Sequence, residues 1–278
     1  MQIAETGARI IVESAIYHLP SEIKMSITPT TVLRSALSGM LARQFDMDVI
    51  AENLANVNTA GYKPNRADFQ ELVVPDASNN EVNVPFRGAS LSVTRLSVSP
   101  GALTPGLSPL ELAIQGDGFF AIRTSDGGTA YTRDGRFSRD TDGNLVTNSG
   151  RRVVWQGNLP ADAEALHVNP DGTVMAQRSG QWTQVGTIQV YRFANPSGLL
   201  NLGENLLGES PDSGAAQAGA PDANGYGKII SGAVESSVAN LGEEMSDMVI
   251  AQRAYGMSLK AFQQADEMIG LAIHLRGG

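Results

Sequence analysis

The sequence contains no cysteine among its 278 residues. Disulfide bonds, thiolate metal ligands and cysteine nucleophiles are therefore excluded. The absence does not fix the compartment, because both reducing and oxidising spaces hold cysteine-free proteins. It does suit a protein that works in an oxidising space without forming cross-links.

Basic residues are also scarce, since 20 Lys and Arg stand against 29 Asp and Glu and the formal net charge is −9. Binding to nucleic acid requires a basic surface that neutralises phosphates, so nucleic acid is not expected as a partner. The acidic balance also argues against binding to anionic membrane surfaces. The histidines, His18, His167 and His274, are scattered and have no metal ligand nearby at helical spacing. We therefore expect no metal site and no cofactor.

Long apolar runs are missing as well. No continuous stretch of about 18 apolar residues exists, so a transmembrane helix is not expected. The N-terminus makes a poor secretory signal, because Glu5 precedes Arg9 and Glu13 interrupts the apolar run. If the protein leaves the cytoplasm, we expect a route that cleaves no signal. Two interpretations of residues 1–24 stay open, namely a short amphipathic helix or an upstream extension of a chain that starts at Met25.

No motif for catalysis stands out. Asp140, Asp142 and Asn144 resemble the start of a calcium loop, but Leu145 stands where that loop needs glycine, and a β-turn is the simpler interpretation. The Gly-Asp-Gly step at 116–118 lies between two predicted strands instead of before a helix, and no Gly-x-Ser-x-Gly sequence occurs. We therefore predict that the protein is not an enzyme.

What the chain does have is an apolar heptad repeat at each end. Such a repeat places its side chains on one stripe of a helix, and the stripe needs a partner helix. We expect helices over about 28–57 and 240–275, with Asn240 and Glu243 in a capping box at the start of the second. The predicted assembly interface consists of Leu33, Met40, Met47 and Leu54 in the first helix and Leu241, Met248, Tyr255, Phe262 and Ile269 in the second.

A second stripe, of small residues, runs beside the C-terminal repeat. Its members again recur every seven residues, and they are Ala251, Ser258, Ala265 and Ala272. Small residues let another helix approach closely, so this helix has two faces to cover, and one partner helix covers only one. Two interpretations remain: the stripes form the internal core of one globular domain, or they pack partly on other subunits.

The segment between the helices is rich in turn signals. Asp-Gly steps recur between short apolar stretches at intervals of roughly ten residues, which is typical of antiparallel strands. Over 111–191 we therefore predict an antiparallel sheet or a small barrel. Around this region we expect an exposed strand over 91–98, an extended proline-rich linker over 99–109, a loop over 201–227 and a last strand over 229–234.

Together these features predict an α+β protein. Long N- and C-terminal helices form a coiled-coil domain, and a central, mostly antiparallel β domain lies between them in the sequence. The predicted division is an N-terminal extension over 1–24, a helical axial core of 25–68 plus 234–278, and a β-rich outer domain over 69–233.

Three blocks of the sequence resemble signatures of the bacterial flagellar rod and hook proteins. They are MDVIAENLANVNTAGYK at 47–63, PLELAIQGDGFF at 109–120 with AYTRDG at 130–135, and VESSVANLGEEM at 234–245 with AQRAY at 251–255. The blocks follow the order of the family, and the likeness extends over about residues 30 to 275. The chain departs from the family at Glu52, where a second Asn is usual, and at 237–239, where an Asn-Val pair is more common.

The resemblance implies an axial, non-enzymatic subunit of the flagellar basal body. Such a subunit would reach the periplasmic rod through the flagellar type III export apparatus, unfolded and without a cleaved signal. Its terminal helices would form an inner tube and its β domain an outer layer, with other copies of itself and other rod and hook proteins as partners. We expect a distal-rod-type protein that transmits torque from motor to hook, with a proximal-rod or hook subunit as the alternative. From another class, a soluble β-domain binding protein with helical dimerisation arms stays open.

Overall fold

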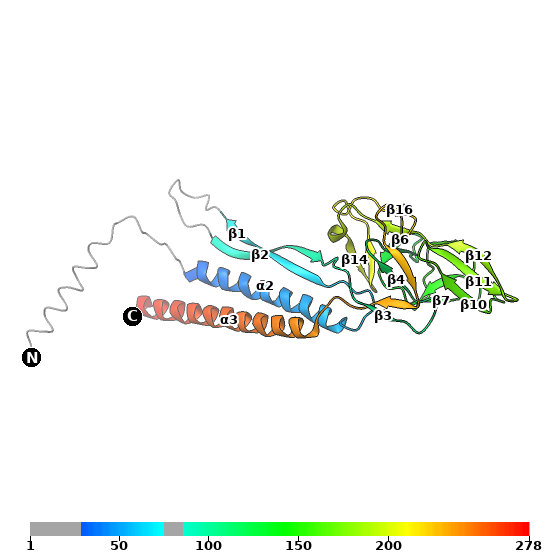
Figure 1. Cartoon of the computed structure of the whole chain (residues 1–278). Coiled ribbons are helices and arrows are strands. Elements are labelled where there is room, and N and C mark those ends of the chain that lie inside the picture. The colour runs from blue at the N-terminus through cyan, green and yellow to red at the C-terminus, as the bar shows by residue number, and fades with distance from the viewer. Residues whose placement is uncertain (1–28, 75–85, 278) are drawn as a thin grey trace, which may run out of the picture. The chain divides into compact units, whose positions relative to one another are not determined.

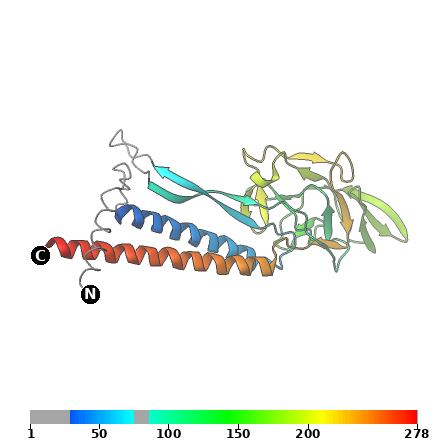
Figure 2. The same cartoon turned by 60° about the vertical axis from the view of Figure 1, so that its left-hand side comes forward.

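The computed structural model describes residues 29–74 and 86–277. Within them, helix α2 spans Pro29–Ala55 and helix α3 spans Leu241–Gly277, and short strands lie between them in the sequence (Figure 1). The two helices run antiparallel beside each other (Figure 2). The prediction of an α+β protein with long terminal helices is confirmed. The N-terminal extension over 1–24 lies outside the described residues.

Helix α2 begins where its sequence favours a helix start. Pro29 has a fixed φ and no N–H, which suits the first turn. The helix ends at Ala55, and Nδ2 of Asn56 donates to the carbonyl of Glu52 at 2.9 Å. Gly61 has a positive φ of 66° and lies in the turn that follows, where its N–H donates to the carbonyl of Glu235 at 2.7 Å.

Helix α3 begins after Asn240. The side-chain Oδ1 of Asn240 accepts a hydrogen bond from the N–H of Gly242 at 2.9 Å, as expected for an N-cap. The predicted return bond from Glu243 is not seen among the described residues. Glu243 pairs with Nη2 of Arg66 at 3.2 Å, because a charged partner attracts the carboxylate more strongly than a neutral N–H does.

The strands are short. They are β1 (Asn65–Val74), β2 (Phe86–Leu96), β3 (Leu103–Pro105), β4 (Leu112–Gln115), β5 (Phe120–Arg123), β6 (Thr129–Thr132), β7 (Phe137–Arg139), β8 (Leu145–Thr147), β9 (Gln156–Gly157), β10 (Ala165–Val168), β11 (Thr173–Arg178), β12 (Gln181–Thr187), β13 (Val190–Arg192), β14 (Leu200–Gly203), β15 (Leu206–Gly208), β16 (Gln217–Gly219), β17 (Lys228–Ser231) and β18 (Ala233–Glu235). Two four-stranded sheets have the orders β10-β11-β12-β9 and β14-β15-β6-β5. The remaining strands form two-stranded pairs, which are β1-β2, β13-β16, β17-β4, β18-β3 and β7-β8.

Pairing between distant segments produces strands that local patterns did not predict. The expected linker over 99–109 contains β3, which pairs with β18. The expected last strand is two strands, β17 and β18, separated at Gly232, whose φ is 72°. The expected loop over 201–227 contains β15 and β16. The partners of β3, β16, β17 and β18 are remote in sequence, so a local window carries no signal for them. Strand β15 pairs with the neighbouring β14 and also with the remote β6.

Strand β5 separates two hydrophobic cores. Side chains alternate along a strand, so Phe120 and Ile122 enter one core while Phe119 and Ala121 enter the other. The first core includes Leu112 and further residues of the short sheets. The second is aromatic, and its members include Tyr131, Phe193, Leu199 and Leu207, with ring centroids of Tyr131 and Phe193 4.8 Å apart.

The chain divides into two compact units. Of the described residues, the first comprises 29–41, 70–74, 86–90 and 255–277, and the second comprises 42–69 and 91–254. The described hydrophobic cores both belong to the second unit.

Candidate functional site

Small side chains make the contact between α2 and α3. In the first unit Ala36 and Ala265 are buried, and a Cβ on Gly39 would lie 3.3 Å from Oγ of Ser258. In the second unit Ala251 is only 1% exposed. Helices approach each other closely where the side chains between them are small. Three residues of the small-residue stripe, Ala251, Ser258 and Ala265, therefore face the other helix of the same chain.

The contact between α2 and α3 that these small residues make is here called the small-residue seam. The predicted heptad residues flank it. Those that are half-buried are Leu33, Met40, Met47, Leu54, Met248, Tyr255, Phe262 and Ile269. Leu241 is 50% exposed. The chain by itself thus covers only part of the stripe, and the uncovered part is available to another chain.

Other large apolar side chains on the two helices are still more open to solvent. They are between 48% and 67% exposed, and they include Leu37 and Leu41 on α2 and Ile250, Met257, Met268 and Leu271 on α3. They are not among the predicted interface residues, because the heptad repeat lies on a different stripe of each helix. Their spacing, mostly three, four or seven residues, also indicates a common helix face.

A buried charge cluster lies in the second unit. Glu235, 1% exposed, accepts from Nζ of Lys63 at 2.5 Å and from Nη1 of Arg133 at 3.3 Å. The N–H of Gly101 donates to Oε1 of the same carboxylate at 2.7 Å. Nζ of Lys63 also donates to the carbonyl of Ser99 at 2.6 Å. Four remote segments of the chain therefore meet at one carboxylate.

Burial shapes the electrostatics of this cluster. Desolvation lowers the pKa of Lys63 and the pKa of Arg133, and the charge of Glu235 partly offsets both shifts. Arg133 also donates to the carbonyls of Ile114 at 3.0 Å and Gly116 at 2.7 Å. Buried charges need such partners, because an unpaired ion inside a protein is strongly unfavourable. No local sequence pattern indicates the cluster, since charged residues are usually exposed.

Near this cluster, the buried side chain of Asn53 also joins several segments of the chain through hydrogen bonds. Its Oδ1 accepts from the hydroxyl of Tyr62 at 3.1 Å and from the N–H of Asn65 at 3.0 Å. Its Nδ2 donates to the carbonyl of Asn65 at 2.9 Å and to the carboxylate of Glu244 at 3.3 Å. Burial, together with the charges of Glu52 and Glu244, raises the pKa of Tyr62. Asn53 thus ties α2 to the following turn, to β1 and to α3.

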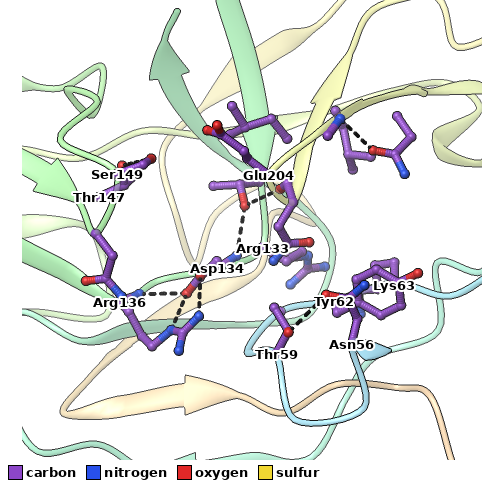
Figure 3. Close-up of a pocket in the computed structure, with 18 of the residues that line it drawn as sticks. Asn56, Thr59, Tyr62, Lys63, Arg133, Asp134, Arg136, Thr147, Ser149 and Glu204 are labelled. Carbon is purple, nitrogen blue, oxygen red and sulfur yellow. Dashed lines mark hydrogen bonds and ion pairs between the residues drawn. The ribbon is translucent and has the colours of Figure 1, made fainter. Parts of the chain in front are cut away.

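A cavity of about 320 Å³, lined largely by polar residues, lies beside the Glu235 charge cluster and Asn53 (Figure 3). Arg136 and Asp134 form a two-point ion pair in its lining, with Nε–Oδ1 and Nη2–Oδ2 distances of 3.1 and 3.0 Å. The hydroxyls of Thr147 and Ser149 lie 3.0 Å apart, and neither contacts a histidine or carboxylate of the described ranges that could act as a base. The described residues contain no group of His, Asp and Glu that could hold a metal ion. The helices of the described ranges include none that is long and apolar enough to cross a membrane.

The fold and these surfaces define a structural assembly protein. Three family models match the chain: "Flagella basal body rod protein" at residues 33–63, "Flagellar hook protein FlgE/F/G D1 domain" at 113–176 and "Flagellar basal body rod FlgEFG protein C-terminal" at 230–275. The matched ranges include the turn that carries Lys63, the segment that carries Arg133 and the strand that carries Glu235.

Whole-chain relatives agree with these matches. The flagellar basal-body rod protein FlgG of Agrobacterium fabrum is 37% identical over 86% of this chain and 97% of that protein. FlgG of Borreliella burgdorferi is 35% identical over 88% of this chain and 98% of its own length. The rod protein FlgF of Mesorhizobium japonicum is 32% identical over 87% of this chain and 96% of that protein.

The chain belongs to the flagellar basal-body rod protein family. It is a structural, non-enzymatic rod subunit of the FlgG-like, distal-rod type. Its place is the rod of the flagellar basal body, and membership of the family implies assembly with other rod proteins.

Proposed function

We propose that this rod subunit assembles with other copies of itself, and with other rod and hook proteins, through its terminal helices. In this arrangement residues 25–68 and 234–278 form the axial core, and 69–233 form the β-rich outer domain. The interface includes the nine heptad residues named above together with the more exposed apolar residues of α2 and α3. A contact of this kind joins different faces of neighbouring copies, so its repetition builds a tube that transmits torque.

The exposed apolar surface of the paired helices is the observation that carries this proposal. Fully burying a large apolar side chain contributes about 1.5–3 kcal/mol. The heptad residues are half-covered, and the outward residues such as Leu41 and Met257 are mostly uncovered. Covering the rest of some ten such side chains therefore yields on the order of 10 kcal/mol, which is comparable to the cost of association.

Export is the second part of the proposal. We infer that the flagellar type III apparatus exports the chain unfolded and that no signal peptide is cleaved. Membership of the flagellar basal-body rod family supports this route. The periplasmic rod would then be the site of folding and assembly.

Two substitutions on the heptad stripe test the assembly role. Leu241→Asp and Phe262→Asp each place a charge where another subunit would pack, so we expect rods to be absent from isolated basal bodies. The β-rich part should stay folded, which the fluorescence of Trp155 and Trp182 reports. Gln181→Asp, an exposed position on β12, is the matched control and should assemble normally. Normal rods from either helix variant would overturn the proposal.

A further inference from the structure

The outward face of α3 combines apolar and basic side chains. Ile250, Arg253, Met257 and Lys260 follow one another at intervals of three or four residues, so they share one face of the helix. All four are exposed. Neither Arg253 nor Lys260 forms an ion pair with any residue of the described ranges. Two basic groups thus stand unpaired beside exposed apolar residues.

The outward face of α2 has the opposite charge. Leu37, Leu41, Gln44, Asp48 and Glu52 follow the same three- and four-residue spacing, and all are exposed. The first half of this face is apolar and the second half is acidic. Asp48 has no ion-pair partner in the part of the chain that the structure describes. Within that part, the carboxylate of Glu52 accepts only from Nδ2 of Asn201, at 3.3 Å.

We propose that the α2 face of one copy packs antiparallel on the α3 face of a second copy. This inference rests on the proposed function, because it names the partner surface of the same helices. One register matches apolar with apolar and acidic with basic positions along both faces. It places Leu37 opposite Leu271, Leu41 opposite Met268, Gln44 opposite Gln264 and Asp48 opposite Lys260, with Glu52 within reach of Arg253.

The same chain does not provide this pairing. Within one chain Gly39 faces Ser258, and Asn53 contacts Glu244. That register is displaced from the proposed one by about three helical turns, and it uses the small-residue seam. A second copy, shifted along the helix direction, is the partner that brings Asp48 to Lys260.

Charge complementarity of this kind sets register and partner choice more than affinity. A neutral Asn in place of Glu52 would lose the attraction to Arg253. The face therefore discriminates in favour of rod subunits that carry basic residues at the matching positions of α3.

Charge reversal tests the pairing in the source bacterium with its own copy of the gene deleted. One variant carries Asp48→Lys and Glu52→Lys, and another carries Arg253→Glu and Lys260→Glu. Each alone juxtaposes like charges, so we expect about tenfold fewer complete rods by electron microscopy of isolated basal bodies. Co-expression of the two variants should restore rods, because alternate copies then attract. A single chain with all four changes should also assemble.

The controls separate this inference from the proposed function. Asp162→Lys with Asp212→Lys reverses two exposed carboxylates of the β-rich part and should leave rod numbers unchanged. If both helix reversals assemble like the unaltered chain, the charge pairing is wrong, while the loss of rods in Phe262→Asp still supports assembly through the helices. If the reversals fail and neither combination restores rods, the pairing is also overturned.

Cysteine cross-linking provides a second, independent measurement, since the chain has no cysteine of its own. A chain with Leu41→Cys and Met268→Cys should form a ladder of multimers on a non-reducing gel when rods are oxidised, because each disulfide joins two copies. A chain with Gly39→Cys and Ser258→Cys should keep the mass of one chain, since those positions face each other within it. Rods that contain the first pair but give no ladder would contradict the register, because a disulfide needs Cα atoms about 4.4–6.8 Å apart.

Discussion

Lys63 and Glu235 form an ion pair with 2.5 Å between Nζ and Oε1, although 172 residues separate them in the chain. Lys63 lies in the turn after α2, and Glu235 ends β18, shortly before α3. Arg133, which follows β6, completes the cluster at 3.3 Å. Both helices are therefore anchored near one end to the β-rich part of the second unit through a single buried carboxylate.

Removing the charge of Glu235 should destabilise the protein strongly. Glu235→Gln leaves Lys63 and Arg133 buried without a counter-charge, and breaking a buried pair in this way costs about 3–5 kcal/mol of unfolding free energy. Urea unfolding followed by the fluorescence of Trp155 and Trp182 measures the loss.

An exposed ion pair is the matched control for this change. Arg151 and Glu204 lie 2.7 Å apart, and the Glu204 side chain is 59% exposed. Exposed pairs contribute about 0–1 kcal/mol, so Glu204→Gln should change stability little. Equal losses in the two variants would show that burial of the Glu235 cluster has no special energetic role.

Gly61 should not tolerate a side chain. Its φ is 66°, and a Cβ there would lie 2.4 Å from backbone atoms of Arg133 and Asp134. We expect Gly61→Ala to lower the unfolding free energy by about 3 kcal/mol or more, since backbone strain and a clash add. Gly180 has a similar φ of 74° with nothing within 4 Å, so Gly180→Ala should cost only about 1 kcal/mol. Thermal unfolding measures the loss of stability in both variants. Similar melting temperatures for Gly61→Ala and Gly180→Ala would contradict the prediction.

Tyr62 should make stability depend on alkaline pH. Its pKa is raised above the ordinary value of 10.0, chiefly by burial and then by the charges of Glu52 and Glu244. Above about pH 10 the unfolded chain loses this phenolic proton while the folded chain keeps it, so the folded state binds more protons and stability falls as pH rises. Tyr62→Phe removes this component.

The measurement for Tyr62 is the unfolding free energy between about pH 8 and about pH 12. The unaltered protein should lose stability more steeply than Tyr62→Phe. Some slope should remain in the variant, because burial also raises the pKa of Tyr131. Parallel curves for the two proteins would refute the assignment to Tyr62.

Ala251 should not accept a larger side chain. It is 1% exposed in the helix seam, and overpacking a close contact typically costs about 1–3 kcal/mol. We expect Ala251→Leu to reduce helix stability in the unassembled chain, as measured by circular dichroism during thermal unfolding. Ala261→Leu, at an exposed position of the same helix, should leave that transition nearly unchanged. A larger loss at Ala261 would indicate that α3 presents a different face to α2.

The two long helices and the turn-rich middle follow from local patterns in the sequence. Helical periodicity is local, so the spacing of apolar residues, Pro29 at one start and Asn240 at the other predicted α2 and α3 to within a few residues. Asp-Gly steps likewise predicted turns, as at Gly127 between β5 and β6. The same local patterns predicted an interface on α2 and α3. A pattern within one helix shows which of its faces are apolar, but it does not show which segment packs on each face.

Which helix faces meet and which charges are buried depends on how the segments of the chain pack together. Packing places Ala251 and Ala265 in the seam, and it leaves Ile250 and Met257 in solvent, although all four lie on one amphipathic helix. It also buries Lys63 and Glu235, whose residue types indicate surface positions. Both outcomes depend on contacts between segments far apart in the chain. Such contacts stabilise the fold, but no local periodic pattern in the sequence predicts them.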